Sequence, residues 1–480
     1  MNIFLNSIER GSCLSKFNSF LGFEKIADCI SKKDAHVHFV GAGGISMYSL
    51  FVFTRARGIS ASGSDKSKSE RTEKLIARGE DVKVPENIEA VAKASLLVYS
   101  LAVSENDAEL RIAEELGIPA ISRAEYLAYL SLEYKMKLSV SGSHGKSTAT
   151  AMLAKVLSDA ELFPSAISGA ELSGTDEPYI MGSSDYLVFE ACEYKDSFLK
   201  FTPDISVFLN LELDHTDYFK SFDDIGRSFL SAMERARVCV VNKDDRELYS
   251  LATLSESRII SFGIEEDADI RAVNLKSDFG RYSFSVVKSG EIIAEISLSV
   301  LGKFSVYNAL AAFSAAYTLG VEPSVASKAL SGFCGIGRRL ENLGKRKDGS
   351  PIIYDYAHHP SEIASSISAV RELFKGEIAV IFKPHTYTRT RDLFDAFVTS
   401  LALADKVYLS EIDAIRESAI KGINAESLAK AIGGSAEALS DDLIIERVKK
   451  FNGAIIIMGA GNVEKIKAEI LSELMLDNSL

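Results

Sequence analysis

The chain has 480 residues, 47% of them hydrophobic and 25% charged, which exceeds what one hydrophobic core supports and predicts about three globular domains. Its formal net charge of -13 argues against a surface that binds the phosphate backbone of nucleic acid, because that binding needs clustered Lys and Arg. We therefore predict no nucleic-acid partner, whereas small anions remain compatible with local groups of backbone N–H and cations.

The first predicted element is a helix in an N-terminal extension, residues 1–34, where apolar residues over 20–30 recur at helical spacing. Residues 35–132 then alternate short β-rich runs with amphipathic stretches, including a predicted helix over 105–117. This alternation indicates a parallel, Rossmann-like α/β domain. The predicted strands cover 37–40, 59–62, 96–100 and 118–122.

A second α/β domain is predicted over residues 133–332, with runs rich in β-branched and aromatic residues that suit strands buried on both faces. Alternating polarity over 281–300 instead predicts an antiparallel hairpin around Ser289-Gly290, at the edge of this domain. The predicted strands cover 186–190, 205–210 and 239–242, and the predicted helices 306–320 and 324–333.

The third domain, residues 333–480, repeats the alternation of strand and helix and is also predicted to be Rossmann-like. Its predicted strands cover 352–357, 378–382, 406–410 and 454–461.

Cysteine usage and apolar runs bear on the compartment. The five cysteines are dispersed without a Cys-x-x-Cys pair, which indicates neither a disulfide framework nor a zinc site. No run of 18 apolar residues occurs, and charged residues interrupt the opening segment before a signal-peptide core develops. The sequence predicts a cytoplasmic protein without membrane insertion, either a monomer or a homodimer.

A glycine loop at 142–147 carries the clearest chemical signal. An apolar run leads into Gly142 and Gly145 and then into a helix-forming segment, so backbone N–H groups and a helix dipole would face a phosphate. Lys146 would supply a charge beside the β- and γ-phosphates, and Ser147 a hydroxyl for Mg²⁺. Two residues separate the glycines where four are usual, so we predict a shortened P-loop. A simple turn is the alternative, and the ordered strand, glycines, Lys-Ser and helix disfavour it.

Two polar residues follow strands of the same predicted domain. Glu190 ends the run 186–190, and His215 follows the run 205–210. Parallel α/β sheets place ligands of a magnesium nucleotide at this carboxyl edge. Either residue alone would be read as an ordinary polar strand end, but the nearby phosphate loop favours Glu190 as a metal ligand. His215 is either a second metal ligand or a group that orders a ligand's water.

An earlier glycine loop follows the run 37–40. Asp65 stands 24 residues after Gly41, about where dinucleotide folds place a ribose-binding acid. Ser46 replaces the third glycine of that fingerprint, so the loop alone is a weak indication of a nicotinamide oxidoreductase. Together with the phosphate loop, it predicts two phosphorylated ligands.

The C-terminal third is dense in Arg, His and Asp beside predicted strand ends, in segments 335–341, 354–362 and 383–392. Such cations suit a site where a carboxylate binds and negative charge develops during phosphoryl and acyl transfer. A solvated basic face is the alternative, which fits Arg391 better than His358-His359-Pro360.

These segments, in this order, resemble the Mur ligases, ATP-dependent enzymes that add amino acids to the peptidoglycan precursor. The similarity runs from about residue 36 to the C-terminus, and DYAHHP and PHTYTRT are typical of the member that adds L-alanine and its close kin. The resemblance implies a first domain that binds a UDP sugar, a central domain that binds ATP and a third that carries the amino-acid site. The segments are HFVGAGGIS, SGSHGKSTAT, EACEYKDSFL, LNLELDHTDYF, GIGRRLE, DYAHHPSE, PHTYTRTRD and MGAGN.

The resemblance also implies roles for individual residues. The UDP diphosphate would be held by Gly41, Gly43, Gly44, Ile45 and Ser46, with Asp65 near the uridine. ATP would be bound by Gly142, Ser143, His144, Gly145, Lys146, Ser147, Thr148, Asn308, Arg339 and Asp355. Metal ligands would be Ser147, Glu190 and His215, and catalytic residues Lys146, His215, His359, His385 and Arg389, with His358 also at the reacting end.

Five positions depart from the family pattern. Cys192 stands where Asp is frequent, and Phe304-Ser305 replace a usual His-Asn pair that contacts adenine. Thr386 stands where some members carry Arg, and Asn462 where Asp is frequent.

The implied reaction is ATP-dependent ligation of L-alanine to the lactyl carboxylate of UDP-N-acetylmuramate through an acyl phosphate, with ATP and Mg²⁺ as cofactors. A ligase that attaches a recycled peptide, glycine or serine to the same sugar is an alternative. A P-loop-type small-molecule kinase is an alternative of another class and predicts phosphate transfer without an amino acid. A non-catalytic binding module is disfavoured by Lys146, Glu190 and His215 together.

Overall fold

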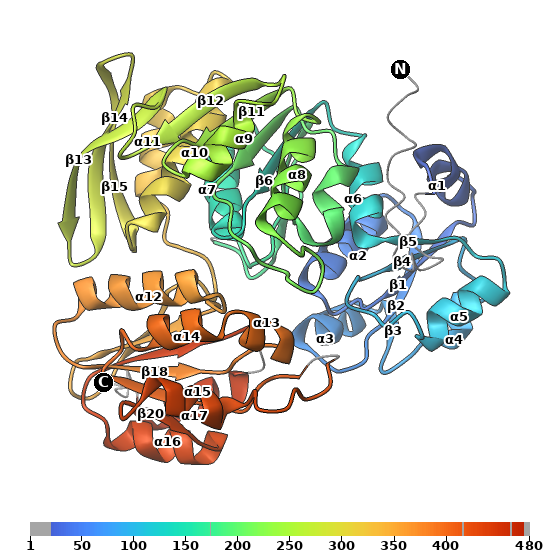
Figure 1. Cartoon of the computed structure of the whole chain (residues 1–480). Helices are drawn as coiled ribbons and strands as arrows, with labels where there is room; N and C mark the ends of the chain where they lie inside the picture. Colours follow the sequence, from blue (N-terminus) through green and yellow to red (C-terminus); the bar gives the residue numbers. More distant parts are fainter. Residues whose placement is uncertain (1–20, 173, 415–416, 461–462, 475–480) are drawn as a thin grey trace, which may run out of the picture. The chain divides into compact units, whose positions relative to one another are not determined.

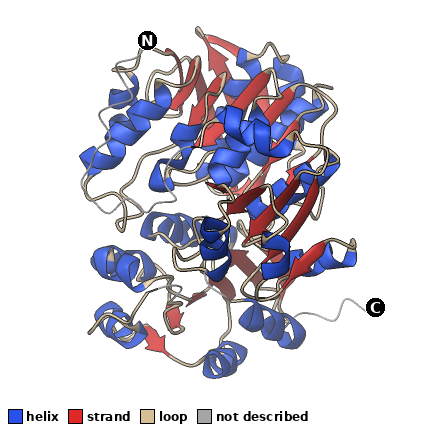
Figure 2. Cartoon of the chain, turned by 90° about the vertical axis from the view of Figure 1, so that its right-hand side faces the viewer, coloured by secondary structure: helices blue, strands red, loops and turns tan. Residues whose placement is uncertain are grey.

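The computed structural model describes residues 21–172, 174–414, 417–460 and 463–474, and the chain divides into two compact units, Met1–Lys135 and Met136–Leu480. Three sheets built mainly from parallel strands, with helices packed against them, confirm the predicted α/β fold class (Figure 1, Figure 2). Within these residues no helix combines the length and apolar character needed to span a membrane.

The first unit is a five-stranded parallel sheet of order β3-β2-β1-β4-β5. The order reverses between β1 and β4, so the loop after β1 lies at the switch point where such sheets bind ligands. The predicted helix of the extension is present as α1 (Phe23–Ile30); Asn462 and residues 1–20 lie outside the described residues. The strands are β1 His36–Val40, β2 Ser60–Ser64, β3 Asp81–Lys83, β4 Leu96–Tyr99 and β5 Ala120–Ser122. The remaining helices are α2 Ile45–Ala56, α3 Glu70–Ala77, α4 Ile88–Val91, α5 Ala108–Glu115 and α6 Arg123–Ser131.

The second unit opens with a ten-stranded sheet of order β15-β14-β13-β12-β11-β10-β6-β9-β7-β8, parallel from β13 to β7. The predicted hairpin is confirmed at its edge, because β14 and β15 pair antiparallel around Ser289 (φ 50°) and Gly290 (φ 84°). The strands are β6 Met136–Ser141, β7 Ser165–Ile167, β8 Tyr179–Ile180, β9 Tyr186–Glu190, β10 Ile205–Phe208, β11 Val238–Asn242, β12 Arg258–Gly263, β13 Ile270–Asp278, β14 Arg281–Lys288 and β15 Glu291–Leu301.

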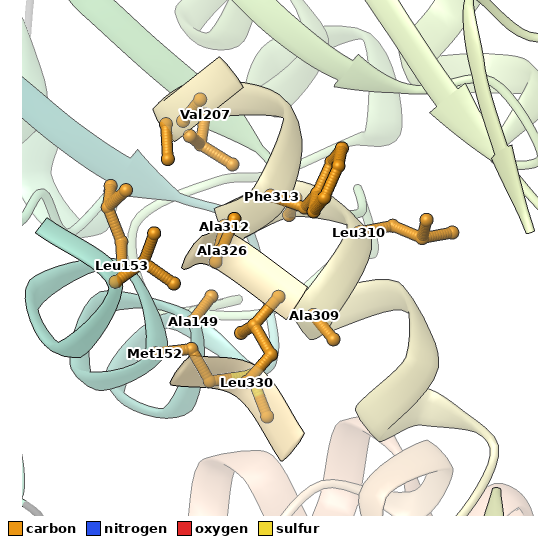
Figure 3. Close-up of a cluster of buried hydrophobic side chains, with 14 of the residues drawn as sticks. Ala149, Met152, Leu153, Val207, Ala309, Leu310, Ala312, Phe313, Ala326 and Leu330 are labelled. Carbon is orange, nitrogen blue, oxygen red and sulfur yellow. The ribbon is translucent and has the colours of Figure 1, made fainter. Parts of the chain in front are cut away.

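Helix α7 (Lys146–Asp159), which follows the glycine loop, is anchored by an apolar core. Figure 3 shows its side chains packed against those of α10 (Phe304–Thr318) and α11 (Pro323–Ser331) and against Val207 of β10. Burial of small and large apolar residues on all three helices fixes where α7 begins, and so fixes the loop before it. The other helices of this part are the 3₁₀ helix η2 Tyr194–Lys200, α8 Phe222–Met233 and α9 Arg246–Ala252.

A six-stranded sheet of order β16-β17-β21-β18-β19-β20 completes the second unit, with only the β16–β17 pair antiparallel. Two apolar cores lie on its two faces. The strands are β16 Glu341–Lys345, β17 Pro351–Asp355, β18 Ile378–Phe382, β19 Lys406–Leu409, β20 Ala436–Ala438 and β21 Ala454–Met458. The helices are α12 Pro360–Leu373, α13 Tyr387–Asp392, α14 Phe394–Leu401, α15 Ala425–Ile432, α16 Asp441–Lys450 and α17 Glu464–Leu474.

Candidate active site

The shortened glycine loop connects β6 directly to α7. Gly145 caps α7 with φ 82°, and a Cβ there would lie 2.6 Å from the Oδ1 atom of Asn308. Position 145 therefore requires glycine both for its left-handed backbone and for the close approach of α10. Asn308 therefore lies next to the backbone of the glycine loop.

Lys146 is held by backbone and by one buried carboxylate. Its Nζ donates to the Gly142 carbonyl at 2.5 Å and to Glu193 Oε2 at 3.1 Å. Glu193 is 1% exposed. Burial alone would lower the pKa of Lys146, but Glu193, Cys192 and Glu190 together outweigh it and raise that pKa, so the ammonium stays charged.

Ser147 and Glu190 meet beneath the loop. Ser147 Oγ donates to Glu190 Oε2 at 2.7 Å, and the Gly169 N–H donates to the same oxygen at 2.9 Å. The register of β6 and β9, with Val140 opposite Glu190, produces this contact. Hydroxyl and carboxylate oxygens are the ligands that Mg²⁺ prefers, so the pair fits that ion.

His215 is placed beside Glu193. It has a left-handed backbone (φ 52°), and its Nε2 lies 3.5 Å from Glu193 Oε1. Ligand atoms of Cys192, Glu193 and His215 all lie within 4.8 Å of one another. Burial lowers the pKa of His215, but Cys192, Glu193 and Asp214 outweigh it and raise it to about 10. His215 thus shares a carboxylate with Lys146.

His144, within the loop, bridges two carboxylates. Its Nε2 lies 3.2 Å from Glu212 Oε2, and its Nδ1 lies 3.2 Å from Glu362 Oε1. Its backbone N–H donates to Asn210 Oδ1 at 2.8 Å. Burial opposes a charge on His144, but the Glu362 and Glu212 carboxylates outweigh it and raise its pKa to about 9. The ion pair between His144 and Glu362 thereby connects the glycine loop to the start of α12.

Glu362 organises the first turn of α12. It accepts the N–H groups of His358 at 3.1 Å and His359 at 3.3 Å, and Arg339 Nη1 donates to it at 3.3 Å. Burial raises the pKa of Glu362, but the charge and hydrogen bond of His144, together with its other neighbours such as Arg339, outweigh it and hold that pKa well below the ordinary value. Burial lowers the pKa of His358 to about 3, so this ring is neutral.

Arg389, on α13, pairs with Asp214, which follows β10. Its Nη2 lies 3.0 Å and its Nε 3.3 Å from Asp214 Oδ1. Burial raises the pKa of Asp214, but Arg389 together with His215 and the other neighbouring imidazoles outweighs it and lowers that pKa far below its ordinary value. The structure places His385 in the loop between β18 and α13.

A cavity of about 720 Å³ lies within the second unit, between the glycine loop and the strand ends of the six-stranded sheet. Its size is that of a site for a nucleotide-sized ligand. Burial raises the pKa of Asp355, in its wall, to about 6, although Arg339 opposes the shift. Six residues predicted to bind ATP line it: His144, Gly145, Thr148, Asn308, Arg339 and Asp355.

The other glycine loop, in the first unit, connects β1 to α2. The Gly43 N–H donates to Asp65 Oδ2 at 2.9 Å, and a Cβ at position 43 would lie 2.9 Å from the same oxygen. Asp65 is therefore drawn onto the loop that is predicted to hold a diphosphate. Ile45 and Ser46 begin α2, where backbone N–H groups have no intrahelical acceptor.

Sequence reasoning assigned no role to several residues of this site. Each of them forms a hydrogen bond or ion pair with a residue of a distant segment, so only the fold identifies them. These residues are Glu193, Asn210, Glu212, Asp214, Ser361 and Glu362.

Three family models match consecutive parts of the chain. Residues 36–135 match the Mur ligase family, catalytic domain, residues 140–316 the Mur ligase middle domain, and residues 338–464 the Mur ligase, glutamate ligase domain. Two proteins named UDP-N-acetylmuramate–L-alanine ligase serve as examples of relatives. That of Caldicellulosiruptor saccharolyticus is 37% identical over 92% of this chain and 98% of its own length. That of Aquifex aeolicus is 36% identical over 92% and 98%.

Solved structures show the same fold. The UDP-N-acetylmuramate-alanine ligase MurC of Thermotoga maritima has a TM-score of 0.78 and 26% identity, over 91% of this chain and 98% of that one. The murein peptide ligase of Psychrobacter arcticus has a TM-score of 0.70 and 24% identity, over 91% and 98%. With relatives above 30% identity along nearly its whole length, the chain belongs to the Mur ligase family of ATP-dependent ligases.

Proposed function

We propose that this protein ligates L-alanine to the lactyl carboxylate of UDP-N-acetylmuramate at the expense of ATP. The observation that carries the proposal is the cavity of about 720 Å³ that joins the glycine loop to the start of α12. Relatives aligned over more than nine-tenths of the chain are named for this reaction. ATP and L-alanine would both bind in that cavity.

In this proposal the predicted domains keep separate tasks. Residues 35–132 bind the UDP sugar through Gly41, Gly43, Gly44, Ile45 and Ser46, with Asp65 near the uridine. Residues 133–332 bind ATP, and residues 333–480 supply the amino-acid site. Residues 1–34 carry no assigned task.

The ATP subsite is proposed to use the loop from Gly142 to Thr148, with Asn308, Arg339 and Asp355. Lys146 and Arg339 remain charged and would stabilise the phosphoryl group as it moves. Ser147 and Glu190 would hold Mg²⁺, which neutralises phosphate charge when bound, and His215 would join them after it releases its proton.

The proposed reaction has two steps. The lactyl carboxylate attacks the γ-phosphorus of ATP, which forms an acyl phosphate and releases ADP. The amine of L-alanine then attacks the acyl carbon, and phosphate leaves. A cation beside the reacting carboxyl group would stabilise the oxyanion that forms, a role that suits Arg389.

Histidines at the reacting end differ in their fitness to accept the amine proton. Burial and the His144 charge lower the pKa of His359, so its ring is neutral at neutral pH, as a general base must be. His358 is neutral as well, but its pKa of about 3 makes it a poor base. We therefore assign proton acceptance to His359 and keep His385 as a proposed catalytic residue.

The test is phosphate release from ATP in the presence of UDP-N-acetylmuramate, with L-alanine, glycine, L-serine and a tripeptide added in turn. The proposal expects release that depends on L-alanine and a product that contains it. Release without any amino acid would indicate a kinase, and dependence on the tripeptide would indicate a peptide-recycling ligase. Either result would contradict the proposal.

Lys146→Ala tests the division of labour between the glycine loops. Turnover should be abolished while the UDP sugar still binds, because Lys146 is assigned only to ATP. Loss of UDP-sugar binding in a folded variant would show that the loops do not act as separate sites.

A further inference from the structure

Four side-chain nitrogen and oxygen atoms lie close together where the glycine loop meets α12. His144 Nε2 and His359 Nδ1 each lie 3.2 Å from Glu212 Oε2. Ser361 Oγ lies 2.7 Å from Glu212 Oε2, 2.8 Å from His359 Nδ1 and 3.0 Å from His144 Nε2. The Ser361 hydroxyl therefore lies within hydrogen-bond distance of all three other atoms.

Two of these separations, from Glu212 Oε2 to the two imidazole nitrogens, are close to those around tetrahedral zinc, whereas the three to Ser361 Oγ are hydrogen-bond distances. With Zn–N and Zn–O bonds of about 2.0–2.1 Å, the donors of a tetrahedral site stand roughly 3.3 Å apart. The two measured distances of 3.2 Å match that edge, and the three ligand atoms of His144, Glu212 and His359 all lie within 4.8 Å of one another. Two imidazoles and one carboxylate are also a donor set that zinc enzymes use.

The surroundings of His144 fit a metal ligand as well. Its far nitrogen, Nδ1, lies 3.2 Å from Glu362 Oε1. A carboxylate on the second ring nitrogen is the partner that orients most zinc-bound histidines. His359 is 6% exposed. A metal binds the neutral imidazole, so His144, which is charged between its two carboxylates, would release its proton to solvent when the ion binds.

From this arrangement we propose a binding site for a borderline-soft divalent cation such as Zn²⁺, formed by His144, Glu212 and His359. Ser361 Oγ, 2.7 Å from Glu212 Oε2, would hydrogen-bond to that ligand atom and leave the fourth position of the ion open. The site is separate from the Ser147–Glu190 pair and does not depend on the proposed function. A ring that binds the ion through Nδ1 carries its proton on Nε2, so His359 can accept the amine proton only in the metal-free protein. It uses no cysteine, which is why cysteine spacing gave no indication of zinc.

Bound metal would connect three segments of the second unit. His144 belongs to the glycine loop, Glu212 follows β10, and His359 and Ser361 begin α12. Since His144, Glu212 and Ser361 line the cavity, an ion can reach the site from it. Bound zinc would thus hold the glycine loop against the C-terminal part of the chain.

The experiment is titration of the full-length protein with Co²⁺, the spectroscopic substitute for Zn²⁺, in excess Mg²⁺. A tetrahedral Co²⁺ spectrum that Zn²⁺ removes is expected. Glu212→Gln and His359→Gln should each weaken Zn²⁺ binding more than about 100-fold, because loss of an outer-shell partner alone costs 10–100-fold. Glu362→Gln, which removes such an outer-shell partner, should weaken Zn²⁺ binding about 10–100-fold. Zn²⁺ should also raise the unfolding temperature of the wild type and not of Glu212→Gln.

Cys192→Ser is the matched control, because Cys192, Glu193 and His215 form the other metal-competent group among the described residues. It should keep the Co²⁺ spectrum. Circular dichroism checks that each variant is folded. The proposal is overturned if the wild type gives no tetrahedral spectrum. It is equally overturned if the spectrum survives in Glu212→Gln and His359→Gln, or is lost in Cys192→Ser.

Discussion

Replacing Arg389 by Gln removes the positive charge that faces Asp214 inside the second unit. Side-chain exposure is 12% for Arg389 and 7% for Asp214, so solvent screens the pair little. Removing one partner of a buried ion pair costs about 3–5 kcal/mol, because the remaining charge is left without compensation. The Asp214 carboxylate still accepts the His215 N–H at 2.6 Å, which places the expected loss near the lower end, about 3 kcal/mol.

A double-mutant cycle isolates this energy. Arg389→Gln and Asp214→Asn are measured singly and together, and the double variant should lose less than the sum of the single losses because no buried charge remains. We expect a coupling of at least about 2 kcal/mol. The chain has no Trp, so urea unfolding is followed by circular dichroism. Losses that add within about 0.5 kcal/mol would refute the reasoning.

Turnover of the same four proteins separates structure from catalysis. If Arg389 also contacts a substrate carboxyl group, the double variant regains stability without regaining turnover. Recovery of both would show that Arg389 acts only through Asp214.

Two further predictions concern the glycine loop. Because the pKa of His144 is raised from about 6.5 to about 9, its ion pairs stabilise the fold fully below pH 6.5 and lose that effect as pH rises through 9, at most about 3 kcal/mol. The free energy of unfolding from urea titrations should therefore fall more between pH 6 and pH 10 for the wild type than for His144→Gln, by up to that amount. An equal dependence of this free energy on pH in the two proteins would contradict the assignment. Gly145→Ala should weaken ATP binding, because its Cβ would meet Asn308 at 2.6 Å, whereas Gly320→Ala, with φ 88° and no atom within 4 Å, carries only backbone strain. Similar ATP affinities for these two variants would show that the contact does not matter.

The fold could be predicted where the signal is local. Alternating polarity identified the β14–β15 hairpin, and the order of strand, glycines and helix identified the start of α7, because each depends on neighbouring residues. The sequence predicts that Ser147 and Glu190 lie at the same edge of the sheet, since each comes at the end of a strand or just after one. Their closeness depends on the β6–β9 register, which no local pattern gives.

His144 illustrates what the sequence could not provide. Its place in the loop was evident, but Glu212 and Glu362 approach it from two other segments after the chain has folded. A second example is His215, expected from the strand pattern to serve the metal together with Glu190. Its left-handed backbone turns it toward Glu193, and the conformation of a loop residue has no periodic signature.

The charges around the glycine loop explain why the family's nucleotide should bind as a metal complex. Each cation near the loop already faces a carboxylate, as Lys146 faces Glu193 and His144 faces Glu212 and Glu362. Little uncompensated positive charge is therefore left to receive the phosphates of free ATP. An ion held by Ser147 and Glu190 would supply the missing charge where the phosphates arrive. ATP affinity should consequently fall steeply when Mg²⁺ is chelated, and Glu193→Gln, which frees Lys146, should reduce that dependence. Equal dependence on Mg²⁺ in wild type and Glu193→Gln would show that Glu193 does not restrain Lys146.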